Sequence, residues 1–225
     1  MIKAVIFDMD GTLFDTERVY SQAWYAAGEA LGIAKERIDH ALAHCRGVNA
    51  KSTRLYFETH LADAVTYDDF IETRRPFFDA ILERMGGVPK KPGLDELFSY
   101  LKANGIRIGL ATSTRRARTV EMLTKAGLLD RFDAIMAGDM VENGKPDPEI
   151  YLRAAQEMGI DPAECMGVED SLAGVEAIHR AGMFTVMIPD MVAPTPAVEA
   201  MLDVKCNSLH EIIPLLQRLN KNGVN

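Results

Sequence analysis

The 225-residue sequence contains only three cysteines, at positions 45, 165 and 206, and no CxxC pair. An odd number of widely spaced cysteines argues against a disulfide framework and against a cysteine-based zinc site. We therefore expect Cys45, Cys165 and Cys206 to be reduced thiols that fill small spaces. This cysteine usage is typical of a cytoplasmic protein.

Long apolar runs and an excess of positive charge are also missing. No run approaches the roughly 20 residues of a transmembrane helix. The first apolar run stops at Asp8, which does not fit a signal peptide. The formal net charge of −8 argues against nucleic-acid and membrane-surface partners. No exposed apolar repeat stands out, so we expect a monomer.

The pattern of apolar residues changes twice along the chain. Residues 16–86 read as successive helices, and the first of them carries Val19, Trp24 and Leu31 on one face. Beyond Pro92, short apolar runs alternate with amphipathic segments. The expected strands are 5–7, 106–111, 134–137, 165–168 and 184–188, and the expected helices beyond Pro92 are 94–104, 117–126, 148–158, 171–181 and 208–219.

This alternation predicts the α/β class, with a Rossmann-like parallel sheet covered by helices on both faces. Residues 1–15 and 87–225 would form the core, and residues 16–86 an inserted all-helical cap. Two thin connections would join the cap to the core, which is how a movable lid is attached.

Two carboxylates follow the first strand. Asp8 and Asp10 are two residues apart, a spacing that places side chains on the same face of a strand. Like charges that close raise each other's pKa unless a cation or hydrogen bonds intervene. The pair therefore suggests a functional site at the end of this strand, one that a cation or hydrogen bonds would stabilise.

Polar residues also follow three other expected strands. Each group has an ordinary structural explanation, because hydroxyls cap helices, loop lysines are solvated and acidic residues favour helix starts. A polar group after every one of these strands is hard to explain by capping. The groups are Thr112-Ser113-Thr114, Lys145-Pro146-Asp147 and Glu169-Asp170-Ser171.

The charges of these groups do not balance. Asp8, Asp10, Glu169 and Asp170 bring four negative charges toward one edge of the sheet, and Lys145 brings one positive charge. Oxygen ligands without histidine or cysteine favour Mg²⁺ over zinc or copper. Mg²⁺ held by few carboxylates usually binds a phosphate oxygen as well. The sequence therefore predicts a magnesium and phosphate site.

Four motifs occur in an order that resembles the haloacid dehalogenase-like superfamily of phosphotransferases, in the branch with a helical cap after the first strand. They are DMDGT at Asp8–Thr12, LATST at Leu110–Thr114, GKPDP at Gly144–Pro148 and GVEDS at Gly167–Ser171. Within this branch the sequence is similar to β-phosphoglucomutases and sugar-phosphate phosphatases. The dehalogenases of the superfamily lack the second aspartate, so dehalogenation is disfavoured.

The resemblance implies a role for each core residue. Asp8 would attack phosphorus and form an aspartyl-phosphate, and Asp10 would act as general acid and then as general base. Mg²⁺ would be held by Asp8, Asp170 and the backbone carbonyl of Asp10, with Glu169 as a direct or indirect partner. The phosphoryl group would be bound by the N–H groups of Thr112 and Ser113 and by Lys145.

The cap decides the substrate, and its signals are fewer. Tyr20, Arg46, Lys51 and Arg75 are candidate substrate contacts, with solvated helix faces as the alternative for the three cations. The mutases of the family carry histidine where this chain has Tyr20, so we expect a phosphatase of a small sugar or polyol phosphate. A β-phosphoglucomutase-type reaction is the alternative, and a non-catalytic module that binds a phosphorylated metabolite is a remote one.

Overall fold

The computed structural model describes residues 1–45 and 50–221. The chain divides into two compact units. The first unit contains Met1–Asp15 and the chain from Lys90 onward, and the second contains Thr16–Pro89. The second unit is therefore an insertion after the first strand of the first unit.

The first unit contains a six-stranded sheet in the order β3-β2-β1-β4-β5-β6, with parallel pairing throughout. The predicted α/β class is confirmed. The strands are β1 (Ala4–Phe7), β2 (Arg107–Ala111), β3 (Ala134–Met136), β4 (Cys165–Glu169), β5 (Phe184–Met187) and β6 (Val204–Lys205).

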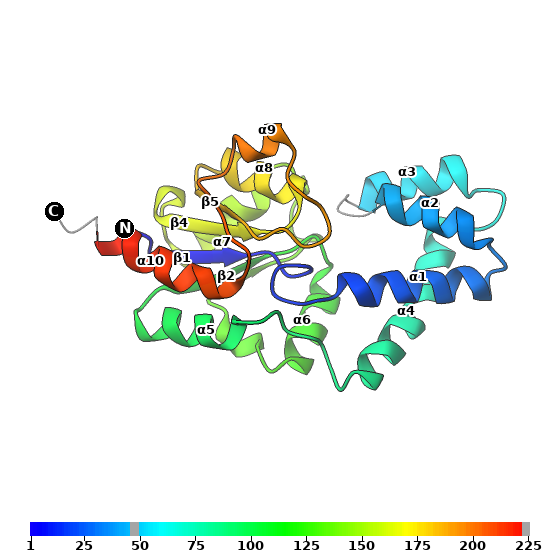
Figure 1. Cartoon of the computed structure of the whole chain (residues 1–225), viewed down its shortest axis with the longest axis horizontal. Coiled ribbons are helices and arrows are strands. Elements are labelled where there is room, and N and C mark those ends of the chain that lie inside the picture. The colour runs from blue at the N-terminus through cyan, green and yellow to red at the C-terminus, as the bar shows by residue number, and fades with distance from the viewer. Residues whose placement is uncertain (46–49, 222–225) are drawn as a thin grey trace. The chain divides into compact units, whose positions relative to one another are not determined.

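Helices cover both faces of this sheet, and Figure 1 shows α8 on one side of the strands and α5 on the other. Ile6 packs with Tyr151 and Ile178 on one face. Phe7 points the other way and contacts Phe98, with ring centroids 5.5 Å apart. The helices of this unit are α5 (Leu94–Ala103), α6 (Arg116–Lys125), α7 (Glu149–Met158), α8 (Leu172–Arg180), α9 (Pro196–Glu199) and α10 (Ile212–Lys221).

Two details near the C-terminus differ from the sequence-based expectation. Strand β6 was not expected, because two residues at a sheet edge give no readable alternation. The closing α-helix begins at Ile212 and not at Ser208, after a 3₁₀ turn at Leu209–Glu211. Pro214 then lies in the first turn, where its missing N–H has no partner to lose.

The described residues of the second unit form four helices around an aromatic core of their own. Trp24 contacts Phe70 and Phe57, with ring centroids 4.8 Å and 5.7 Å away. All three side chains are buried, as expected for Trp24. The helices are α1 (Glu17–Ala30), α2 (Lys35–Cys45), α3 (Ala50–His60) and α4 (Tyr67–Arg84).

Among the residues that the structure describes, no helix combines the length and the apolar character that a membrane crossing requires.

Candidate active site

Asp8 lies directly after β1 and is 7% exposed. Its N–H donates to the carbonyl of Val168 at 3.0 Å, which continues the pairing of β1 with β4 by one residue. Strand alternation places its side chain on the same face as Ile6, the face that α7 covers. Asp8 is thus held in a buried position at the carboxyl edge of the sheet.

Lys145 connects Asp8 to Glu169. Its Nζ lies 2.5 Å from Oδ1 of Asp8 and 2.5 Å from Oε1 of Glu169. The Nζ atom also lies 5.1 Å from the centroid of the Tyr151 ring, and the Tyr151 hydroxyl donates to Oε1 of Glu169 at 3.3 Å. These side chains form a buried cluster in which one lysine lies between two carboxyl groups.

Glu169 is the last residue of β4, and its second carboxylate oxygen closes the start of α8. Oε2 accepts from the N–H of Asp170 at 2.9 Å and from the N–H and hydroxyl of Ser171 at 2.8 Å and 2.9 Å. Together with Lys145 and Tyr151 on Oε1, five donors share a carboxylate that has about four lone-pair positions. The geometry therefore favours Glu169 as a support for neighbouring groups over Glu169 as a direct metal ligand.

Two glycines permit these close approaches. A Cβ atom on Gly174 would lie 1.7 Å from Oε1 of Glu169, so only glycine fits beneath that carboxylate. A Cβ atom on Gly11 would lie 2.3 Å from Oδ2 of Asp170, and Gly11 has a φ of +86° that L side chains rarely adopt. Thr12 completes this contact, because its hydroxyl donates to Oδ1 of Asp170 at 3.1 Å.

Asp10 belongs to the turn after β1, beyond the strand on which strict alternation would apply. Its charge still contributes to the raised pKa of Asp8, so the two carboxylates lie near one another. Oδ2 of Asp10 accepts a hydrogen bond from the hydroxyl of Thr114 at 2.9 Å. The structure thus connects the turn after β1 to the loop after β2.

The loop after β2 differs in one respect from the expectation. The N–H of Thr112 donates to the carbonyl of Met136 at 3.0 Å, so it cannot also bind a phosphoryl group. The Thr112 hydroxyl accepts from the N–H of Thr114 at 3.1 Å and keeps its own hydrogen to donate. Ser113 is exposed, and no described residue accepts a hydrogen bond from its N–H.

The acidic groups of this cluster outnumber its single positive charge, Lys145. Burial raises the pKa of Asp8 to about 8, and Glu169 and Asp10 add to the rise against the opposing effect of Lys145. Burial alone would lower the pKa of Lys145, but the charges of Asp8 and Glu169 hold it well above its ordinary value. Lys145 therefore stays charged, and the site still carries more negative than positive charge.

A hard divalent cation fits this donor set. Asp8, Glu169 and Asp170 each place a carboxylate oxygen within 4.8 Å of the others. The set contains only oxygen atoms, the ligands that Mg²⁺ and Ca²⁺ prefer. Since Glu169 is already saturated by donors, Asp8 and Asp170 are the side chains that suit direct coordination.

Comparisons with known proteins agree with the order of the motifs and with this arrangement of carboxylates, lysine and hydroxyls. Residues 2–182 match the haloacid dehalogenase-like hydrolase family. The chain belongs to this family.

Several relatives of this haloacid dehalogenase-like hydrolase cover more than four fifths of the chain. The phosphorylated carbohydrates phosphatase of Thermotoga maritima is 33% identical over 81% of this chain and 82% of its own. The β-phosphoglucomutase of Bacillus subtilis is 31% identical over 93% of this chain and 95% of its own. A crystal structure of CbbY from Rhodobacter sphaeroides with xylulose-1,5-bisphosphate has a TM-score of 0.76 at 28% identity, covering 94% of this chain and 96% of that one. The predictions of the family and of an enzyme are confirmed.

The candidate cap residues of this hydrolase are only partly described. Tyr20 lies on α1 with its ring centroid 4.5 Å from that of Phe78, and the guanidinium of Arg74 lies 5.0 Å from the Tyr20 ring. Arg75, the residue that the sequence suggested, is exposed on α4. Arg46 lies outside the described residues, and Lys51 belongs to α3 with a side chain outside the described part.

Three contributors to the site were missed in the sequence. Thr12 and Thr114 lie inside the recognised motifs, but roles were predicted only for the neighbouring residues Asp8, Asp10, Thr112 and Ser113. Tyr151 reads as an apolar residue of α7, and a buried aromatic on a helix is usually core. Tyr151 lies only six residues after Lys145 in the sequence, and this short separation was the one indication that it could lie near the site.

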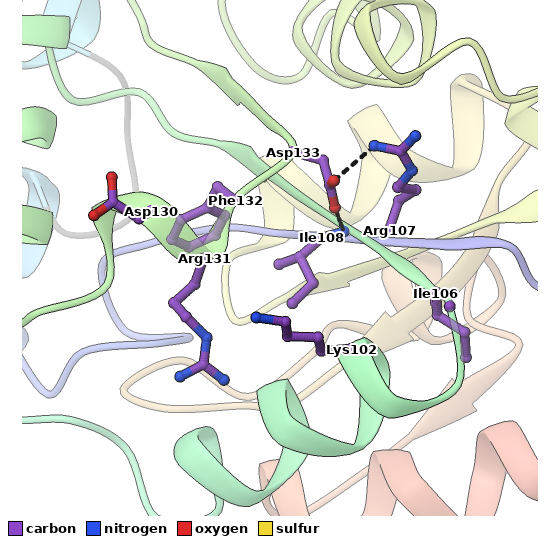
Figure 2. Close-up of a pocket in the computed structure, with 9 residues that line it drawn as sticks. Lys102, Ile106, Arg107, Ile108, Asp130, Arg131, Phe132 and Asp133 are labelled. Carbon is purple, nitrogen blue, oxygen red and sulfur yellow. Dashed lines mark hydrogen bonds and ion pairs between the residues drawn. The ribbon is translucent and has the colours of Figure 1, made fainter.

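A separate cavity of about 250 Å³ lies at the other end of the sheet. Figure 2 shows Lys102, Arg107 and Arg131 around it, with Arg107 paired to Asp133 at 2.7 Å. Arg107 begins β2, so this cavity opens at the amino ends of the strands. It is therefore distinct from the carboxylate cluster at their carboxyl ends.

Proposed function

We propose that the protein is a Mg²⁺-dependent phosphatase that hydrolyses a small phosphorylated sugar or polyol through an aspartyl-phosphate. One observation carries the proposal: a buried Asp8 has one oxygen held by Lys145 and stands beside Asp10 and Asp170. The phosphorylated-carbohydrate activity in the name of the Thermotoga relative supports the substrate class. The expected substrates are cytoplasmic metabolites, and we expect the enzyme to act there as a monomer.

The reaction takes two steps. In the first, an oxygen of Asp8 forms a bond to phosphorus while the bond from phosphorus to the ester oxygen breaks, and the carboxyl group of Asp10 gives its proton to that oxygen. In the second, water forms a bond to phosphorus while the aspartyl-phosphate bond breaks, and the Asp10 carboxylate takes the proton from the water. Inorganic phosphate leaves, and Asp8 returns to its starting state.

The chain's own groups neutralise the phosphoryl oxygens. Lys145 lies on Asp8 and supplies the nearest positive charge. The N–H of Ser113 and the hydroxyl of Thr112 are the donors of the β2 loop that suit the phosphoryl oxygens. Asp8, Asp170 and the carbonyl of Asp10 would hold Mg²⁺, which supplies charge neutralisation on the transferred group.

The helical unit is, in this proposal, a cap that selects the substrate. It is inserted after Asp15 and ends at Pro89, so two connections join it to the catalytic unit. Tyr20 follows the first connection by five residues, and Arg74 covers its ring. Tyr20 and Arg74 are the cap side chains to test first, and Arg75, Arg46 and Lys51 stay candidates.

The decisive experiment traps the intermediate. The protein is mixed with an excess of each phosphorylated sugar, polyol and nucleotide in a panel, quenched in acid and examined by peptide mass spectrometry. We expect phosphate on the peptide that contains Asp8, and substrates ranked by kcat/KM with a sugar or polyol phosphate first. Asp8→Asn is the matched control, because an amide cannot form the acyl-phosphate. Turnover of that variant at the wild-type rate would refute the mechanism.

A mutase is the second candidate, because β-phosphoglucomutase of Bacillus subtilis is 31% identical to this chain. The tyrosine at position 20 favours the phosphatase, since a phenol does not titrate near neutral pH as the family's histidine does. A coupled assay on β-glucose 1-phosphate with catalytic glucose 1,6-bisphosphate separates the two. Glucose 6-phosphate that forms faster than free phosphate would reverse the choice.

A further inference from the structure

One hydrogen bond near the site has no role in the mechanism described so far. The hydroxyl of Thr114 donates to Oδ2 of Asp10 at 2.9 Å, across 104 positions of sequence. Thr114 is half-buried and follows β2, whereas Asp10 lies in the turn after β1. The contact therefore joins two loops at the carboxyl edge of the sheet.

The backbone around Thr114 is fixed from both sides. Its N–H donates to the hydroxyl of Thr112 at 3.1 Å, and its carbonyl accepts from the N–H of Gly138 at 3.0 Å. A Cβ atom on Gly138 would lie 2.2 Å from the carbonyl oxygen of Ser113, so only glycine lets the loop after β3 approach this closely. The backbone position from which the Thr114 hydroxyl reaches Asp10 is thus held by the packing of two loops.

Thr114 does not bond the side chains that hold the nucleophile. Lys145, from the loop after β3, connects Asp8 to Glu169 at the end of β4, whereas Thr114, from the loop after β2, donates to Asp10. The two aspartates are therefore oriented by different parts of the chain. A substitution at Thr114 can disturb Asp10 while the Asp8–Lys145–Glu169 cluster stays intact.

We propose that Thr114 is a positioning residue that aims the carboxyl group of Asp10 at the ester oxygen of the substrate. This inference rests on the proposed function, in which Asp10 gives its proton to that oxygen as the bond to phosphorus breaks. A general acid has to lie within hydrogen-bond reach of the atom that it protonates. The hydrogen bond to Oδ2 restricts the rotation of the carboxyl group and so helps to direct its proton toward that oxygen.

The proposal predicts a dependence on the leaving group. A phenolate with a strong electron-withdrawing group leaves without a proton, whereas a poor leaving group needs the general acid. Proton transfer contributes a factor of about 10²–10⁴, so we expect Thr114→Val to lose about 10- to 100-fold in kcat/KM for phenyl phosphate. For p-nitrophenyl phosphate we expect a loss of less than about threefold. Thr114→Ser keeps the hydroxyl and should restore most of the phenyl phosphate activity.

The test measures kcat/KM for p-nitrophenyl, phenyl and p-methoxyphenyl phosphate with Mg²⁺ present. Thr119→Val is the matched control, because its hydroxyl bonds the carbonyls of Arg115 and Thr114 but does not reach Asp10. Both Thr→Val variants are checked for their urea midpoint, and Thr114→Ala takes the place of Thr114→Val if the latter does not fold. We expect a steeper leaving-group dependence for Thr114→Val and an unchanged one for Thr119→Val.

Two results would overturn the inference. An equal loss with all three esters would assign Thr114 a structural role, and Thr114→Ser with the same defect as Thr114→Val would show that the hydroxyl is irrelevant. The proposed function fails in a different way. If Asp8→Asn or Asp10→Asn kept wild-type turnover of these esters, the aspartyl-phosphate mechanism would fall, and the role of Thr114 with it.

Discussion

Replacing Lys145 by methionine tests the charged cluster most directly. The lysine side chain is 5% exposed and bridges Asp8 and Glu169, whose side chains are 10% and 1% exposed. Removing one partner of a buried ion pair leaves an uncompensated charge and costs about 3–5 kcal/mol. Methionine nearly matches lysine in length, so the loss reports charge and not a cavity. We therefore expect the free energy of unfolding to fall by about 3–5 kcal/mol in EDTA at pH 7.

Urea unfolding followed by far-UV circular dichroism measures this loss. Lys125→Met is the matched control: Lys125 pairs with Glu121 at 2.7 Å on the surface of α6, with side chains 44% and 43% exposed. An exposed pair four residues apart contributes only about 0.3–0.5 kcal/mol. The fluorescence of Trp24, the single tryptophan, reports the helical unit separately. Equal losses for Lys145→Met and Lys125→Met would refute the cluster as a source of stability.

Three further predictions concern the same cluster. Gly174→Ala forces the carboxylate of Glu169 away from its five donors. We expect the free energy of unfolding, measured with urea, to fall by at least about 3 kcal/mol. The neighbouring control Ala173→Gly should lower it by only about 1 kcal/mol. The pKa of Asp8 is raised from 3.8 to about 8 in the folded protein, so its contribution to stability without metal is full below pH 4 and is lost as the pH rises through 8. Mg²⁺ should therefore raise the Tm more at pH 8 than at pH 6 in a thermal scan, and an equal rise at both would contradict the raised pKa. EDTA should abolish turnover and added Mg²⁺ should restore it. The Asp170→Ala variant should need a much higher Mg²⁺ concentration for half-maximal activity. Full activity in EDTA would show that the mechanism does not use a metal ion.

The sequence predicts the strand ends better than it predicts the contacts between them. Apolar runs locate β1, β2 and β4, and parallel topology brings their carboxyl ends together whatever the details of packing. The proximity of Asp8 to Glu169 and Asp170 follows from that topology, because β1 pairs with β4. The side chain that completes the cluster, Tyr151, does not, since its hydroxyl reaches Glu169 only through the particular rotation of α7.

Local hydrogen bonding explains the difference at Thr112. A run of hydroxyl residues after a strand suggests free N–H groups at a helix start, but α6 begins only at Arg116. Strand pairing with β3 continues one residue beyond β2 and takes the N–H of Thr112. The length of a neighbouring strand decides this, and three residues of β3 carry too little pattern to predict where pairing ends.

The small residues of the site are as specific as its charged ones. Gly11, Gly138 and Gly174 each lie where a Cβ atom would come within 2.3 Å of a site residue, namely Asp170, Ser113 and Glu169. Carboxylates that repel one another need rigid backbone and hydrogen-bond donors to stay in place without metal, and a methyl group at any of these positions would displace them. The glycines thus help to set the separation of the charged groups. At that separation Asp8 is buried, Asp10 lies within hydrogen-bond reach of Thr114, and carboxylate oxygens of Asp8 and Asp170 lie within 4.8 Å of each other.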